Sequence, residues 1–269
     1  MLLINGLGAG LEMWRPLVGE LPGREVVALD LPGTGHSGRP RLPMRMPRLA
    51  AAVTAVLDEL ALPRVDLLGN SLGGIVAQEV ARHSPERVTR LVLAATTPGL
   101  PSIPPNPLVA LLMLSPARYY DRRLAELIVP VIAGGRTSRD RRVLREGLRE
   151  RLADPPTPVG YLHQLCSVWG WSGHIHLPRL HMPTLVLHGE EDPVVPVVNA
   201  RYMARRIPNA TLHVIARGGH LILADEAVVA GKVIVEFLSR SARPGPSSSP
   251  RRAAGRTPSA PRRSGRSPW

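Results

Sequence analysis

A serine between glycines is the residue of this chain best suited to chemistry. Residues 69–73 read GNSLG and follow directly on the apolar run 65–68. A G-x-S-x-G pattern between a strand and a helix is typical of a nucleophilic serine. The glycines permit a turn too tight for larger side chains, and the strained Ser71 projects its hydroxyl outward. An ordinary strand-to-helix turn is the alternative, and it is excluded only if partner groups follow in the right order.

A serine hydroxyl needs a general base, and the base needs an orienting acid. The stretch 184–193 (TLVLHGEEDP) offers three carboxylates directly after an apolar run. We prefer Asp192, because the glycine before the acidic residues permits the turn and the proline after them ends the loop. Glu190 and Glu191 remain the alternatives, with a solvated acidic loop as their other role.

The base is expected after the last strand. His220 ends the glycine-containing loop 216–220 (ARGGH), which follows the apolar run 211–215. The order Ser, acid, His along the chain is that of the α/β-hydrolases. Four other histidines fit the role of the base less well, namely His36, His174, His176 and His188. Together with Cys166 they do not have the spacing of a metal-ligand set. We therefore expect no metal and no cofactor.

Two backbone N–H groups are the candidates for stabilising a developing oxyanion. One belongs to Leu72, which follows the nucleophile, and the other to Leu7 in the glycine-rich stretch 5–10 (NGLGAG). This stretch lacks the Gly-Lys ending of a phosphate-binding loop and the spacing of a dinucleotide fingerprint. The residues together predict an ester hydrolase that works through an acyl-enzyme on Ser71, with His220 moving the proton and Asp192 fixing the imidazole tautomer.

Apolar runs that alternate with helical patterns must position these groups. Continuous apolar strands predict a mostly parallel central sheet with helices on both faces. The expected strands are 2–4, 25–29, 65–68, 88–95, 184–188 and 211–215. The expected helices of this core are 11–20, 47–60, 74–83 and 225–239.

A proline-rich stretch breaks the alternation between the fourth and fifth strands. Helical patches at 108–114, 119–129 and 139–152 predict an inserted helical cap over 97–182. The core is then 1–96 together with 183–239. Within the cap, we expect Met113, Trp169 and Trp171 to face an aliphatic substrate, with packing of the cap onto the core as their alternative role.

The chain begins close to its first strand. This fold normally has a β-hairpin before that strand, so either the hairpin is missing or the true start lies upstream. We expect an exposed sheet edge near Met1. The first residues carry no basic region and only a short apolar stretch, and no apolar run approaches about 18 residues. With a single cysteine, these features favour a cytoplasmic protein without a transmembrane segment.

The net charge of +13 is concentrated at the carboxyl end. Residues 240–269 contain eight arginines and no acidic residue, so removing them leaves +13 − 8 = +5. This stretch is rich in Arg, Pro and Ser without apolar periodicity, and we expect it to be disordered. Arginine outnumbers lysine 33 to one, which indicates a chain-wide bias. We therefore predict no specific nucleic-acid partner, and a tether to an anionic surface is the alternative role.

The chain resembles the α/β-hydrolases over residues 1 to 239, and among them the intracellular medium-chain-length polyhydroxyalkanoate depolymerases. The stretches that carry this resemblance are 5–9, 85–87, 91–96, 115–119, 170–172, 183–187, 191–196 and 206–210. The nucleophile, acid and base of that family fall on Ser71, Asp192 and His220. The resemblance implies hydrolysis of 3-hydroxyalkanoate polyester and contact with the polyester granule surface.

Two departures leave the substrate open. Leu72 stands where that family usually has tryptophan, and Arg217 stands where it is acidic. A small-molecule carboxylesterase, lactonase or related hydrolase is the alternative. A non-catalytic granule- or surface-binding protein belongs to a different class, and the predicted triad argues against it.

Overall fold

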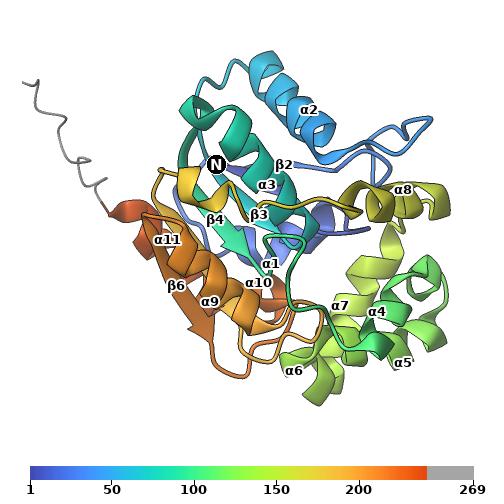
Figure 1. Ribbon diagram of the computed structural model, residues 1–269. Coiled ribbons are helices and arrows are strands. Elements are labelled where there is room, and N and C mark those ends of the chain that lie inside the picture. Colours follow the sequence, from blue (N-terminus) through green and yellow to red (C-terminus); the bar gives the residue numbers. More distant parts are fainter. Residues whose placement is uncertain (241–269) are drawn as a thin grey trace, which may run out of the picture.

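A six-stranded, fully parallel sheet forms the centre of the molecule (Figure 1), a computed structural model that describes residues 1–240. The strand order is β2-β1-β3-β4-β5-β6, and every neighbouring pair is parallel. The parallel sheet predicted from the apolar runs is confirmed. Its strands are β1 (Leu2–Ile4), β2 (Val27–Leu29), β3 (Val65–Asn70), β4 (Val88–Ala94), β5 (Thr184–Gly189) and β6 (Ala210–Ile215).

Helices cover both faces of the sheet, because successive strand side chains point to opposite sides. Leu2 and Ile4 of β1 pack with the helices α2, α3 and α9, whereas Leu3 packs with α1, α10 and α11 on the other face. The bounds of these helices are α1 (Arg15–Val18), α2 (Met46–Glu59), α3 (Leu72–His83), α9 (Val197–Arg206), α10 (Ile222–Asp225) and α11 (Ala227–Ser239).

The segment between β4 and β5 is helical and lies beside the sheet in Figure 1. Residues of α5 and α7 form a small core of their own from Ala125, Val129 and Leu148 with their neighbours. The helices of this segment are α4 (Pro107–Met113), α5 (Arg122–Ala133), α6 (Gly135–Arg139), α7 (Arg141–Ala153) and α8 (Pro158–Val168), with a short 3₁₀ turn η3 (Pro116–Tyr119).

Three expectations about the helices were inaccurate. The predicted helix 11–20 is a 3₁₀ turn, η1 (Leu11–Trp14), followed by the single turn of α1, because Pro16 and Gly19 limit a longer helix. The predicted helix 225–239 corresponds to α11, which begins two residues later, and the short helix α10 that precedes it was not predicted. The helices α6, α8 and α9 were not predicted.

The sheet edge predicted near Met1 lies one strand further out. β1 is interior, because β2 pairs along one side of it and β3 along the other. Its three residues are fully buried, and Val27 donates a backbone hydrogen bond to the Met1 carbonyl at 2.9 Å. Among the described residues β2 is the edge strand on this side of the sheet, and β6 is the edge strand on the other. The disorder predicted for 240–269 concerns residues that, apart from Arg240, lie outside the described part of the chain.

Within residues 1–240, no helix is long and apolar enough to span a bilayer.

Candidate active site

Ser71 occupies the sharp turn between β3 and α3. Its backbone φ of 52° lies in the left-handed region, which is strained for a residue other than glycine. The flanking glycines are required by space. A Cβ on Gly69 would come within 2.6 Å of the Gly74 Cα, and a Cβ on Gly73 would come within 2.5 Å of the Asn5 carbonyl oxygen. The turn therefore has the tight geometry that the GNSLG sequence predicts.

The structure brings together the three residues predicted as nucleophile, acid and base. His220 Nε2 lies 3.1 Å from Ser71 Oγ, and His220 Nδ1 lies 2.8 Å from Asp192 Oδ2. An ionised carboxylate only accepts hydrogen bonds, so Nδ1 carries the proton and Nε2 is free to accept from the serine hydroxyl. The arrangement can therefore activate a serine oxygen as a nucleophile.

Asp192 is held by its own loop. Its side chain is fully buried, and its second oxygen, Oδ1, accepts the backbone N–H groups of Val194 and Val195, both at 2.9 Å. The competing acids point elsewhere. Glu190 accepts the backbone N–H of Arg217, and Glu191 pairs with Arg139.

His188 is a part of the site that the sequence reasoning set aside, because the residue lies in a strand. It is fully buried at the end of β5, and its Nε2 lies 2.8 Å from the Val195 carbonyl and 3.4 Å from Asp192 Oδ2. Both neighbours are acceptors, so Nε2 carries the proton. Burial lowers the pKa of His188 below its ordinary value, which keeps the imidazole neutral behind the acid.

The junction of α5 and α6 presses against the two loops that carry the acid and the base. The backbone N–H of His220 donates to the Ala133 carbonyl at 2.6 Å. A Cβ on Gly135, which has a φ of 53°, would lie 2.7 Å from the Gly219 Cα. A Cβ on Gly134 would lie 2.6 Å from the Glu191 carbonyl oxygen. Backbone therefore meets backbone here, and the glycines make that approach possible.

The glycine-rich loop after β1 lies beside the nucleophile. A Cβ on Gly6 would come within 3.3 Å of the Ser71 Cβ. Tyr119 donates its hydroxyl to the Leu7 carbonyl at 2.9 Å, and Gln164 accepts the Gly8 N–H at 2.9 Å. Two side chains from the segment between β4 and β5 thus hold the loop, a role that no periodic pattern in the sequence indicates.

A small cavity of about 50 Å³ opens at Ser71. Leu7, Met113 and His220 line it as well, and contact of Met113 with a substrate stays a prediction. The Leu72 side chain belongs to the buried core at the start of α3, and its predicted role concerns only its backbone N–H.

The two tryptophans expected at the substrate do not line this cavity. Trp169 is 92% exposed at the end of α8. Trp171 packs on Gly99, and its indole N–H donates to Glu79 on α3 at 3.3 Å. Its ring joins the segment between β4 and β5 to the core, which was the alternative role considered for it. Composition could not separate the two roles, because both favour an aromatic ring.

Comparison with known proteins shows to which family of proteins the chain belongs. The family model of the alpha/beta hydrolase fold matches residues 1–227, and the chain belongs to this family.

Individual relatives show which kinds of hydrolase the chain is similar to. The chain is 40% identical over 241 residues to a poly(3-hydroxyalkanoate) depolymerase of Ectopseudomonas oleovorans, a match that covers 89% of this chain and 84% of that protein. It is 30% identical to a putative carbamate hydrolase of Variovorax paradoxus, over 91% of this chain and 93% of that protein. Among solved structures, a thermophilic esterase from Thermogutta terrifontis is similar with a TM-score of 0.74 and 27% identity, covering 88% of each chain. The resemblance to polyhydroxyalkanoate depolymerases is therefore confirmed.

Proposed function

We propose that this hydrolase cleaves carboxylic esters through an acyl-enzyme on Ser71, and that its substrate is a poly(3-hydroxyalkanoate) or its oligomers. The hydrogen-bonded chain from Ser71 through His220 to Asp192 is the observation that carries this proposal. The 40% identity to a poly(3-hydroxyalkanoate) depolymerase supports the choice of substrate.

In the proposed reaction, Ser71 Oγ attacks the ester carbonyl while His220 Nε2 takes its proton. His220 then gives this proton to the leaving alcohol, and Asp192 stabilises the imidazolium between the two steps. A water molecule activated by His220 next attacks the acyl-enzyme and releases the acid. The backbone N–H groups of Leu7 and Leu72 would bind the oxyanion. Tyr119 supports this role of Leu7, because its hydrogen bond fixes the Leu7 carbonyl and with it the loop.

Residues 97–182 would act as the lid over this site, with Met113 in contact with the acyl chain. Contact with the polyester granule surface and a location in the cytoplasm remain predictions from the sequence.

The variant Ser71→Ala tests the reaction. We expect hydrolysis of a nitrophenyl ester to fall by about 10⁶-fold, leaving only the catalysis that substrate binding and the oxyanion donors supply without a nucleophile. Ser239→Ala is the matched control, since Ser239 ends α11 and, among residues 1–240, its hydroxyl bonds only to the Val235 carbonyl of its own helix. Turnover by Ser71→Ala at a tenth of the unmodified rate would refute the assignment.

A small-ester hydrolase is the second candidate, supported by the similarity to an esterase and to a putative carbamate hydrolase. A suspension of medium-chain polyester assayed beside short soluble esters separates the two. Release of hydroxyacids from the suspension supports the depolymerase. Rapid turnover of small esters with none of the polymer supports the alternative.

A further inference from the structure

Two arginines line the cavity that contains Ser71 and His220, and no aspartate or glutamate of the described chain lines it. Arg118 comes from η3 and Arg151 from α7. Removing a cation from water is costly unless an opposite charge or sufficient hydrogen bonds replace the solvent. The charge of this wall is therefore complementary to an anionic ligand.

Arg118 is buried with only neutral partners. Its residue is 1% exposed, yet within residues 1–240 no carboxylate lies within 4.0 Å of its guanidinium. Nη1 donates to the Ser115 carbonyl at 2.7 Å and Nη2 to the Tyr161 hydroxyl at 2.9 Å. The Nε atom has no protein partner in the described part of the chain. The positive charge is thus solvated by dipoles and left without a counterion.

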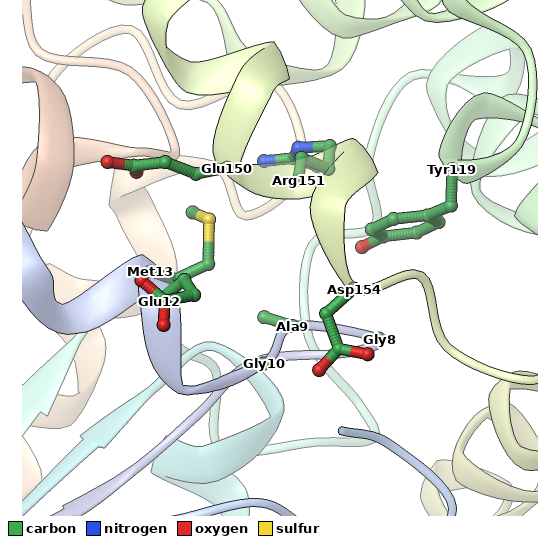
Figure 2. A pocket seen from close by; sticks show the side chains of 9 residues that line it. All are labelled: Gly8, Ala9, Gly10, Glu12, Met13, Tyr119, Glu150, Arg151 and Asp154. Carbon is green, nitrogen blue, oxygen red and sulfur yellow. The ribbon is translucent and has the colours of Figure 1, made fainter. Parts of the chain in front are cut away.

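Arg151 lies near the same tyrosine ring, that of Tyr119, as Arg118 does. Its Cζ is 5.5 Å from the centroid of the Tyr119 ring, and the Cζ of Arg118 is 4.7 Å from that centroid. Figure 2 shows Arg151 and Tyr119 on the wall of the adjoining hollow, over the loop at Gly8. Tyr119 therefore links both cations to the loop that borders the nucleophile.

Three carboxylates line that adjoining hollow, and they leave Arg151 available. Glu12 is paired with Arg15. Neither Glu150 nor Asp154 comes within 4.0 Å of a cationic side chain among residues 1–240, so no ion pair holds Arg151 away from the Ser71 cavity.

We propose that Arg118 and Arg151 form a subsite for a carboxylate on the substrate. This inference rests on the proposed ester hydrolysis at Ser71. In an oligomer of hydroxyacids, the free carboxylate lies at one end, on the unit that supplies the alcohol of the last ester bond. The subsite therefore selects that last ester. Water adds across this bond, and the products are one hydroxyacid and an oligomer shorter by one unit. Guanidinium groups suit this task because they bind carboxylates through paired N–H donors.

A matched pair of soluble esters tests the subsite. One is 3-(hexanoyloxy)hexanoate, and the other is 3-(hexanoyloxy)hexanamide, which replaces the carboxylate by a neutral group of the same shape. Release of hexanoate measures kcat/KM for both. We expect the unmodified enzyme to favour the carboxylate by about tenfold or more, the size of a charge-assisted hydrogen bond. In Arg151→Gln this preference should fall to about twofold or less. Arg149→Gln, an exposed neighbour on α7, should keep it.

The outcomes separate the subsite from the proposed function. If the unmodified enzyme hydrolyses both esters equally well, the subsite is wrong and the hydrolase stands. If Arg151→Gln retains the full preference, the assignment of the arginine is overturned. If the unmodified enzyme hydrolyses neither of these esters nor a nitrophenyl ester, the proposed function itself fails. The thermal midpoint of Arg151→Gln, measured beside that of Arg149→Gln, verifies that the variant is folded.

Discussion

Asp192 uses both of its carboxylate oxygens, and this division explains why it rather than a neighbour orients the base. Oδ2 faces His220 while Oδ1 accepts two backbone N–H groups of the following loop. The carboxylate cannot rotate without losing these bonds. Glu190 and Glu191, two and one residues earlier, bond to Arg217 and Arg139 and lie outside this arrangement.

The change Asp192→Asn tests that division. An amide can present its N–H₂ to His220 Nδ1 and so stabilise the wrong imidazole tautomer, which lowers kcat by about 10⁴-fold in a serine triad. We expect a loss of this order in nitrophenyl ester turnover. Glu191→Gln is the matched control and should retain kcat within about twofold, as expected for an exposed ion pair. The reverse ranking would identify Glu191 as the acid.

Single residues were predictable where a local pattern fixes them. Each member of the triad follows an apolar strand in a short turn, as Ser71, Asp192 and His220 do. Their residue types and their order along the chain therefore predict that they lie together in the folded protein. Arg151 and His188 were missed because their importance depends on contacts that no local pattern encodes. The core contacts of Trp171 were unpredictable for the same reason, since its partners Glu79 and Gly99 lie 92 and 72 residues away.

At the scale of elements, the α5–α6 junction joins the segment between β4 and β5 to the catalytic loops. The Ala133 carbonyl accepts the His220 N–H, and the Gly134-Gly135 pair touches both loops. The position of His220 therefore depends on a turn that lies 85 residues earlier in the chain. The strands were predictable from continuous apolar runs. The helix α8 was not, because its sequence PVGYLHQLCSV has a weak apolar stripe and is held by packing.

The variant Gly135→Ala should push the loop that carries His220 away from the α5–α6 junction. Its Cβ would meet the Gly219 backbone, and alanine at a φ of 53° is also strained. A shift of about 1 Å at the base can lower kcat about 10²-fold, and we expect a loss of that order. Gly147→Ala on α7 is the control, since a Cβ there meets nothing within 4 Å. That control should keep kcat and increase the free energy of unfolding by about 0.5–1 kcal/mol. Full activity of Gly135→Ala would show that the α5–α6 junction can shift to accept the new Cβ without moving His220.

For the whole molecule, buried histidines connect stability to pH. Burial lowers the pKa of His188 in the folded protein, whereas an unfolded histidine has a pKa of about 6.5. Below that pH, His188 binds a proton in the unfolded chain but stays neutral in the folded protein. The free energy of unfolding therefore falls as the pH drops below about 6.5, until the lowered folded pKa is reached.

Urea unfolding at pH 7.5 and at pH 6 measures this dependence. We expect the unmodified protein to lose more stability between the two values than His188→Gln, whose amide can still donate to the Val195 carbonyl but does not titrate. Comparing the variant with the unmodified protein removes the contributions of other groups. These include His176, whose pKa burial also lowers, and Asp30, whose pKa burial raises. An equal loss in both proteins would contradict the assignment to His188.

The single cysteine of the chain has a practical consequence. Cys166 is a free thiol exposed on α8, two positions beyond the glutamine whose side chain holds the loop at Gly8. A maleimide dye would therefore attach at one defined place without any engineering. Its emission would report directly, during turnover, whether this helix shifts as substrate enters and product leaves.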